Sequence, residues 1–224
     1  MILTGSDGNP RSFPDLEIFE LEETYPYLLR NHFKEAVFWQ LSFGNITTSQ
    51  LLSQPMAYLT HWKPDIIIVQ SGMTDCRPEG FSDLQKEIIH KLTFRRLKKL
   101  VEHPDWIKKR QKYRVAPSSF NTTIKKFKMV FPRSKIFWLE ICAGAQYEQA
   151  RPGLGKRMLQ YNEIIKKVYG EDYIPVQQKM LEIGGFNGMD HVHWNKKGHH
   201  AVAEILTEKI EQYWPQYAGA RHGK

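Results

Sequence analysis

A run of four β-branched residues, Ile66-Ile67-Ile68-Val69, constrains the fold of this chain more than any other feature. Pro64 and Asp65 precede the run, and Ser71 and Gly72 follow it, so turn residues bound it on both sides. An unbroken run of this kind is typical of a parallel strand that is covered on both faces. A sheet that contains such a strand needs helices on both of its sides.

Short apolar runs alternate with amphipathic helical stretches along the chain. We expect strands at residues 2–3, 37–41, 66–69, 136–139 and 173–176. Thr47 or Thr48 can cap a helix that runs to about Trp62, and residues 82–85, Ser-Asp-Leu-Gln, have the spacing of a capping box. This alternation predicts an α/β fold in which crossover helices join parallel strands. The last helix carries an apolar stripe made of Val202, Ile205, Leu206, Ile210 and Tyr213.

The composition favours one domain over residues 1–224. The chain has 41% hydrophobic and 12% aromatic residues, enough for one substantial core, and shows no repeat. No apolar run approaches the ~20 residues that a membrane span needs, and the start of the chain lacks the pattern of a signal peptide. We therefore expect a cytoplasmic protein in which Cys76 and Cys142 are reduced thiols. A disulfide between them is the alternative.

The segment Asp190-His191-Val192-His193 lies just before the last expected helix and places a carboxylate three residues ahead of an imidazole. That spacing lets Asp190 orient His193 as a general base. Such a base needs a nucleophile, and Ser6 follows the first expected strand near the other end of the chain. The chain order would then be Ser, Asp, His. These blocks lie beyond the ends of the expected strands, where open α/β sheets bind their ligands.

With these residues the sequence resembles the SGNH, or GDSL-like, hydrolase family, whose members carry a serine after the first strand and Asp-x-x-His before the last helix. Residues 42–45, Ser-Phe-Gly-Asn, resemble the family's glycine block, and residues 71–76, Ser-Gly-Met-Thr-Asp-Cys, resemble its Gly-x-Asn-Asp block. Thr74 stands where the family has asparagine, and Thr4-Gly5-Ser6 replaces Gly-Asp-Ser. The resemblance implies a flavodoxin-like, three-layer α/β/α sandwich around a central, mostly parallel five-stranded sheet.

The resemblance also implies a role for each site residue. Ser6 would be the nucleophile, His193 the base and then the acid, and Asp190 the group that orients the imidazole. The oxyanion would be bound by the backbone N–H groups of Ser6 and Gly44 and by the Thr74 side chain. Gly72, Asp75 and Asn45 would form the rim of the site. No cofactor is implied.

A metal site is a second chemistry that the histidines near the end allow. Its ligands would be Asp190, His191, His193, His199 and His200. The adjacent His199 and His200 would point in different directions from the first turn of the last helix, so we expect no metal and a capping or buried role for His199. Ser71 is a rival nucleophile, but no Gly-x-Ser-x-Gly elbow surrounds it.

A basic helical insertion is expected at about residues 82–116. Residues 86–114 contain eleven Lys or Arg against three acidic residues, a surplus that equals the +8 charge of the whole chain. One interpretation is a solvated helical face that packs its apolar side on the core or on another subunit. The alternatives are a lid or wall that attracts an anionic polysaccharide precursor, a phosphorylated sugar or an anionic membrane surface. Nucleic acid is not expected, because no nucleic-acid module surrounds the segment.

Three functions remain open from the sequence. The first is a serine esterase that removes acyl groups, chiefly acetyl, from an acylated carbohydrate. Residues 70–78 and 138–152 resemble, more loosely, SGNH-like proteins of bacterial surface-polysaccharide synthesis, and this resemblance alone implies the carbohydrate. The second is a sugar O-acyltransferase that uses the same triad. The third is a non-catalytic binding or assembly protein, which the altered Thr74 and Gly5 positions would fit. The oligomeric state is left open.

Overall fold

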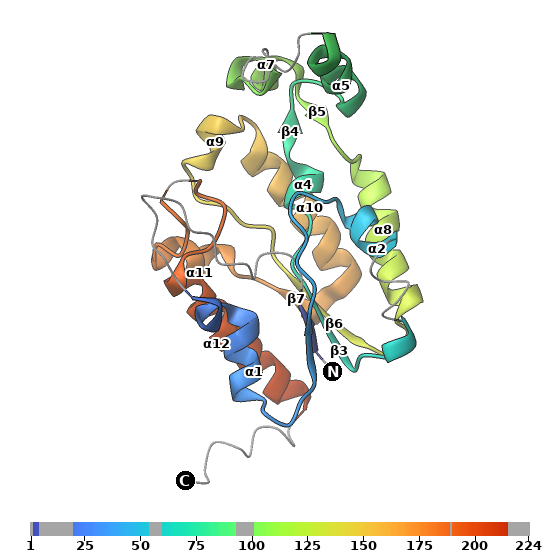
Figure 1. Ribbon diagram of the computed structural model, residues 1–224, viewed down its shortest axis with the longest axis vertical. Coiled ribbons are helices and arrows are strands. Elements are labelled where there is room, and N and C mark those ends of the chain that lie inside the picture. The colour runs from blue at the N-terminus through green and yellow to red at the C-terminus, as the bar shows by residue number, and fades with distance from the viewer. Residues whose placement is uncertain (1, 5–19, 54–59, 93–100, 189, 215–224) are drawn as a thin grey trace.

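The computed structural model describes residues 2–4, 20–53, 60–92, 101–188 and 190–214. Its main sheet has five parallel strands in the order β2-β1-β3-β6-β7. Of these strands, β3, β6 and β7 are labelled in Figure 1. The predicted α/β fold with a parallel sheet is confirmed, and the β-branched run forms β3 with the expected bounds. The strands are β1 Ile2–Thr4, β2 Phe38–Gln40, β3 Ile66–Val69, β6 Lys135–Leu139 and β7 Tyr173–Ile174.

The strand order creates a switch in the direction of winding. β2 lies outside β1, so the chain moves one way along the sheet from β1 to β2 and then returns across β1 to form β3. The reversal falls between β1 and β3. In open α/β sheets such a reversal leaves a crevice at the carboxyl ends of the strands, because the flanking connections leave in opposite directions. The topology therefore marks the carboxyl ends of β1 and β3 as the place for a ligand site.

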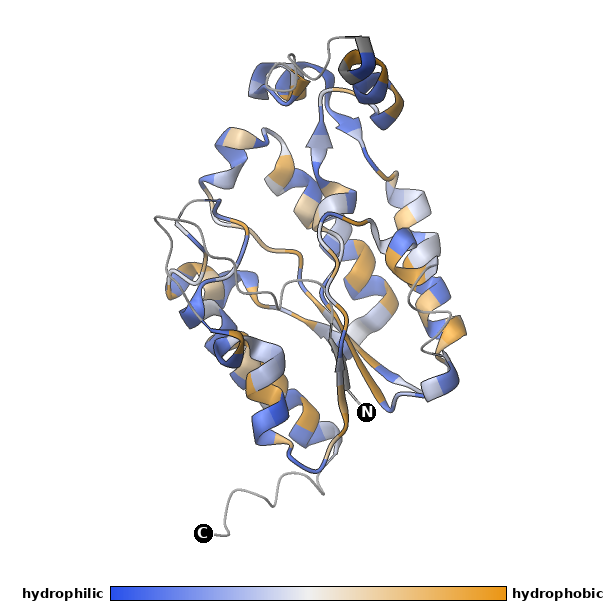
Figure 2. Ribbon diagram, viewed as in Figure 1, coloured by the Kyte–Doolittle hydropathy of each residue, from blue (hydrophilic) through white to orange (hydrophobic). Residues whose placement is uncertain are grey.

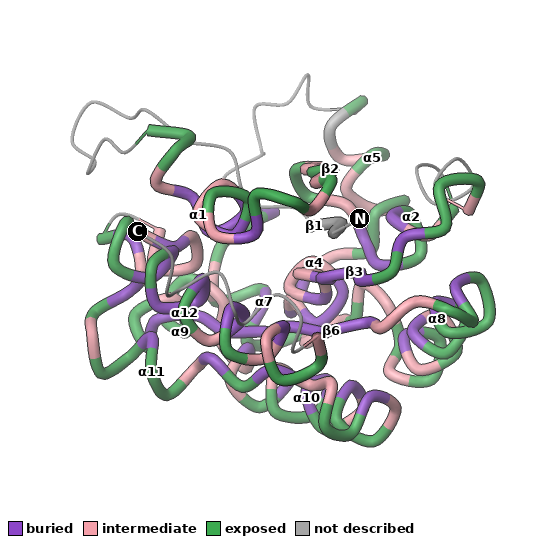
Figure 3. Tube along the Cα trace, turned by 90° about the horizontal axis from the view of Figure 1, so that it is seen from below, coloured by how far each residue is buried: buried purple, intermediate pink, exposed green. Residues whose placement is uncertain are grey.

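Successive residues of β3 and β6 pack into different cores. Ile67 and Trp138 belong to one hydrophobic cluster, and Ile66 and Phe137 belong to another. β3 is hydrophobic along its length in Figure 2, and Figure 3 shows helices on both sides of β3 and β6. The first cluster is covered by α2 Thr48–Ser53, α8 Pro117–Val130 and α10 Leu154–Tyr169. The second is covered by α1 Tyr25–His32, α11 Gln177–Glu182 and α12 Lys196–Tyr213. Coverage on both faces explains why the run at β3 contains no polar residue.

The last helix, α12, packs on the second cluster as its stripe predicted. Val202, Leu206 and Ile210 are fully buried, while Tyr213 at the end of the stripe is 44% exposed. The helix begins after Asn195, whose side chain accepts a hydrogen bond from the backbone N–H of Gly198 at 3.0 Å. A Cβ at Gly198 would lie 2.2 Å from the backbone oxygen of Gly185, so only glycine allows this contact. The close approach fixes the start of α12 against the preceding loop.

The basic insertion extends beyond the carboxyl end of the sheet (Figure 1). It contains α5 Asp83–Leu92 and α7 Pro104–Arg110, and the predicted capping box is present, with Ser82 and Gln85 exchanging hydrogen bonds of 3.1 and 3.3 Å. Residues 93–100 of the basic segment lie outside the described residues. Sequence patterns missed a small antiparallel sheet of β4 Pro78–Glu79 and β5 Lys112–Tyr113, which joins the insertion to the core.

Shorter elements complete the described chain. The helix expected after Thr47 is present as α2, and the Thr47 hydroxyl accepts a hydrogen bond from the Gln50 N–H at 3.3 Å. Near its expected end, Thr60–Trp62 forms a separate 3₁₀ turn, η2. Within the described ranges, no helix is long and apolar enough to cross a membrane. Cys76 and Cys142 are both reduced thiols, as expected. The remaining short helices are η1 Leu21–Glu23, α4 Met73–Cys76, α9 Tyr147–Ala150 and η3 Gly170–Asp172.

Candidate active site

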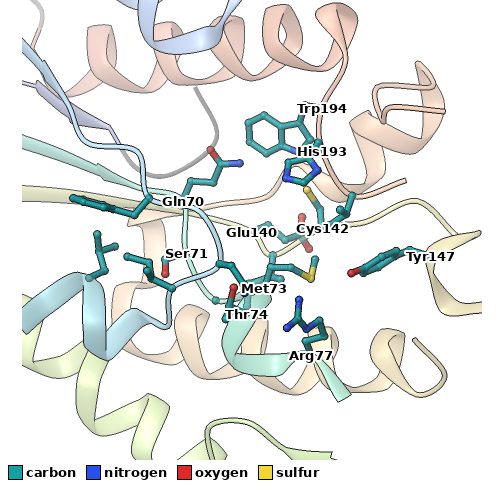
Figure 4. Close-up of a pocket in the computed structure, with 17 residues that line it drawn as sticks. Gln70, Ser71, Met73, Thr74, Arg77, Glu140, Cys142, Tyr147, His193 and Trp194 are labelled. Atoms are coloured by element: carbon teal, nitrogen blue, oxygen red, sulfur yellow. The ribbon is translucent and has the colours of Figure 1, made fainter. Parts of the chain in front are cut away.

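A cavity of about 310 Å³ lies at the carboxyl ends of β3 and β6. Four stretches of chain line it, within residues 43–51, 70–77, 140–147 and 192–194. Three of the four follow strands, and the fourth is the loop that precedes α12. The cavity therefore occupies the end of the sheet that the strand order marks as a ligand site (Figure 4).

Gly72 shapes the wall of the cavity between β3 and α4. Its φ is +122°, and a Cβ there would lie 2.5 Å from Cδ1 of Ile141. Both features exclude other residues, because a side chain would be strained and would collide with the neighbouring loop. The turn at Gly72 directs α4 across the end of the sheet, and places Thr74 among the residues that line the cavity.

Asp190 and His193 form the pair that their spacing predicted. Nδ1 of His193 is hydrogen-bonded to Oδ2 of Asp190, and the side chain of His193 lines the cavity. The other carboxylate oxygen accepts the backbone N–H groups of Val192 and His193 at 3.1 and 3.0 Å. Burial of Asp190 opposes its ionisation, but these hydrogen bonds outweigh burial and lower its pKa to about 2. The carboxylate is thus charged at neutral pH and holds Nδ1 of the imidazole, so Nε2 is the nitrogen that could act as a base.

The loop that carries this pair is fixed to the core on both sides. The backbone oxygen of His193 accepts from the N–H of Asn187 at 2.7 Å. Trp194 is 3% exposed and its ring lies edge-on to His199, 5.7 Å between centroids. His199 is buried, as expected, and its Nδ1 accepts the backbone N–H of Tyr25 at 3.3 Å. The position of His193 therefore depends on the junction between α1 and α12.

The predicted nucleophile, Ser6, lies outside the described residues, as does Gly5. Its role and its distance from His193 stay predictions. The described neighbour is Thr4, the last residue of β1, which lies between β2 and β3 in the parallel sheet. The chain thus leaves β1 at the same edge of the sheet as the cavity.

The expected oxyanion and rim residues lie in different surroundings. Thr74, Gly72 and Asn45 line the cavity. Asn45 has a φ of +61°, and its side-chain oxygen accepts from Arg114 at 3.4 Å. Gly44 is exposed in the turn between Phe43 and Asn45, both of which line the cavity, but Gly44 itself does not. The donor roles of Gly44 and Thr74 stay predictions.

Asp75 does not lie on the rim, where the sequence analysis placed it. It is 1% exposed and accepts three hydrogen bonds from Thr48, two from the backbone N–H at 3.1 and 2.9 Å and one from the hydroxyl at 2.9 Å. Burial raises the pKa of the Asp75 carboxyl to about 6, although the bonds from Thr48 act in the opposite direction. Asp75 therefore anchors the start of α2 behind the cavity.

Ser71, the rival nucleophile, lines the cavity but bonds away from the imidazole. Its hydroxyl lies 2.9 Å from the hydroxyl of Thr48, and its backbone oxygen accepts from Nε1 of Trp138 at 3.2 Å. Among the described residues, no hydrogen bond joins Ser71 to His193. In the described ranges, no three His, Cys, Asp or Glu side chains are grouped closely enough to hold a metal ion.

Sequence reasoning did not assign two charged residues that line the cavity, Arg77 and Glu140. Oε2 of Glu140 accepts the backbone N–H groups of Val176 and Gln177 at 2.8 and 2.7 Å, so this carboxylate caps the start of α11. Arg77 ends α4 and faces the cavity opposite His193 (Figure 4). The sequence did offer a signal for Arg77. It directly follows residues 71–76, which resemble the Gly-x-Asn-Asp block, and it lies three residues after Thr74.

Comparisons with known proteins give a match in structure alone. No family model matches the sequence, and no curated protein matches it significantly. A lipase/acylhydrolase from Enterococcus faecalis superposes with a TM-score of 0.63 at 12% identity, covering 95% of each chain. A catalytic mutant of an acetylxylan esterase from Geobacillus stearothermophilus gives 0.58 at 18% identity and 93% of each chain. A putative GDSL-like lipase from Parabacteroides merdae gives 0.58 at 15% identity, covering 92% of this chain and 93% of the other. The chain therefore has the α/β fold that these lipases and esterases share.

Proposed function

We propose that this protein is a serine esterase of the SGNH, or GDSL-like, type that removes acyl groups, chiefly acetyl, from a carbohydrate. The observation that carries the proposal is the Asp190–His193 pair, which presents an imidazole to the cavity at the switch point of the sheet. An acetylxylan esterase among the structures of the same fold supports the choice of an acetylated sugar. The looser resemblance to surface-polysaccharide proteins supports a role in making such a polymer.

The proposed reaction has two steps. The hydroxyl oxygen of Ser6 attacks the ester carbonyl carbon while Nε2 of His193 takes the hydroxyl proton. The tetrahedral intermediate then releases the sugar hydroxyl, which takes that proton from His193, and an acyl-serine remains. In the second step water attacks the acyl-serine, and His193 again takes a proton and returns it to Ser6 as the carboxylic acid leaves. Asp190 holds the imidazole and stabilises its charged form through both steps.

The test is covalent labelling with a fluorophosphonate, read by mass spectrometry of the intact protein and its peptides. The wild type is compared with Ser6→Ala, His193→Ala and Ser71→Ala. We expect one adduct on Ser6, absent from the first two variants and retained in Ser71→Ala. An adduct on Ser71 would overturn the assignment of the nucleophile. A folded wild-type protein that takes no label would favour the binding or assembly function.

Thr74 provides a second test, because it stands where the family carries an asparagine. Loss of an oxyanion donor commonly costs roughly 100- to 1,000-fold in turnover. If the Thr74 hydroxyl is a weak substitute, Thr74→Asn will raise kcat for p-nitrophenyl acetate, and Thr74→Val will lower it. Equal rates in all three proteins would show that Thr74 does not contact the oxyanion. Acetate release with and without a sugar acceptor then separates hydrolysis from transfer to a sugar hydroxyl.

A further inference from the structure

Arg77 lies on the wall of the cavity opposite the imidazole of His193 (Figure 4). Its Nε and Nη2 both lie 3.0 Å from Oε1 of Glu79, which fixes the plane of the guanidinium. Among the described residues, no hydrogen bond or ion pair uses Nη1. A guanidinium held by one edge presents its remaining N–H groups in a fixed direction, which suits recognition of a carboxylate or phosphate.

The surroundings of Arg77 carry more positive than negative charge. Glu79 is 3% exposed, and besides Arg77 it has Lys86 at 2.9 Å and Arg151 at 3.6 Å. Asp83 lies 3.4 Å from Lys86 and 3.8 Å from Arg114. In the described part of the chain, four cations thus share two carboxylates. These six side chains together therefore carry two more positive than negative charges.

Two of these cations each have one nitrogen atom that makes no hydrogen bond. Nε of Arg114 and Nη1 of Arg151 are buried and have no hydrogen-bond partner. These nitrogens lie 3.8 Å from Asp83 and 3.6 Å from Glu79, which is too far for a hydrogen bond, so the two acidic side chains hold them only as loose ion pairs. Glu140 is an acidic residue on the cavity wall, but its carboxylate bonds to the start of α11. Among the described residues, it forms no ion pair with this cluster.

We infer that Arg77 binds an anionic group of the substrate, so that the preferred substrate is an acylated sugar that carries a carboxylate or a phosphate. The inference rests on the proposed function and adds the substrate class to it. The ester would lie against His193, and the anion would lie against Nη1 of Arg77. Lys86, Arg114 and Arg151 would raise the local concentration of such substrates without touching them.

The experiment compares matched O-acetylated sugars that differ in one group. An acetylated methyl glucoside is neutral, the acetylated methyl glucuronoside has a carboxylate in place of the hydroxymethyl group, and acetylated glucose 6-phosphate has a phosphate there. Acetate release gives kcat and KM for each. The variants are Arg77→Gln, which removes the charge, and Arg77→Lys, which keeps the charge but loses the planar, two-pronged set of guanidinium N–H donors. Arg133→Gln is the control, because Arg133 is exposed at the opposite, amino end of β6.

We expect kcat/KM to be about 10-fold higher for at least one anionic sugar than for the neutral one, chiefly through KM. The preference should disappear in Arg77→Gln, weaken in Arg77→Lys and remain in Arg133→Gln. The sugar with the higher kcat/KM shows whether the site binds a carboxylate or a phosphate. Equal rates for all three sugars in the wild type would overturn the inference, as would a preference that survives Arg77→Gln.

A binding measurement separates this inference from the proposed function. Isothermal titration of the wild type with methyl glucuronoside and with inorganic phosphate needs no turnover. Binding that Arg77→Gln abolishes would support the anion site even if no ester is hydrolysed, in which case only the esterase function fails. Hydrolysis of the neutral ester together with no binding and no preference would support the esterase and overturn the anion site.

Discussion

His199 should make the stability of this protein fall as the solution is acidified. The ring is 1% exposed and accepts the N–H of Tyr25, which requires an unprotonated Nδ1. Burial, followed by the nearby His200 and His193, lowers the pKa of His199 to about 4, against roughly 6.5 in an unfolded chain. Between these two values the unfolded chain binds the proton and the folded chain does not. The contribution of His199 to stability is therefore complete above about pH 6.5 and is lost as the pH falls towards 4.

The size of the loss follows from the two pKa values. From about pH 7 to about pH 5, His199 should remove about 2 kcal/mol from the free energy of unfolding. Asp75 acts in the opposite direction over the same range. Burial raises the pKa of Asp75 to about 6, above its unfolded value, so the folded chain gains the proton first as the pH falls. The total pH dependence therefore mixes both groups, and a variant is needed to isolate His199.

The assay is urea unfolding at the two pH values, followed by tryptophan fluorescence. His199→Gln keeps a side-chain acceptor but cannot titrate. Its free energy of unfolding should therefore fall by about 2 kcal/mol less than that of the wild type between the two pH values. His61→Gln, at an exposed position, is the control and should behave as the wild type does. If the wild type and His199→Gln lose the same stability, the reasoning from burial is refuted.

Three further predictions concern the loops around the cavity. Asp190→Asn should lower kcat for p-nitrophenyl acetate by roughly 1,000- to 10,000-fold with little change in KM, and a fall of less than tenfold would contradict its role. Gly72→Ala should lower the free energy of unfolding by about 3 kcal/mol in urea, because of its φ and its contact with Ile141, whereas Gly188→Ala, with open space around it, should change it by less than about 0.5 kcal/mol. Asp75→Ala should cost about 2 kcal/mol in the same assay, since it leaves the start of α2 without its acceptor, and an unchanged midpoint would count against that anchor.

The sequence predicted the elements whose patterns lie within a single short segment of the chain. The run at β3, the stripe of α12 and the capping box at Ser82 each depend on residues within one element, so periodicity and spacing reveal them. The Asp190–His193 contact was predictable for the same reason, because three residues separate its partners.

Contacts between distant segments were not predictable in this way. The anchor between Asp75 and Thr48 joins residues 27 positions apart, and nothing in the local pattern distinguishes it from a residue on the rim of a site. The two-residue strands β4 and β5 are too short to show alternation. The direction of the Arg77 side chain depends on the turn at Gly72 and on the pairing with Glu79, and the local sequence shows neither.

The elements that form the sheet and the site are synthesised far apart in time. β1 is made before the other strands of the sheet, yet it lies between β2 and β3, and the Asp190–His193 pair belongs to the loop before α12, the last described helix. A nascent chain can therefore complete most of the sheet while it has no imidazole at the cavity. The esterase activity that we propose would then appear only when α12 has left the ribosome and docked beside α1. An ester substrate would thus report the completion of folding on the ribosome.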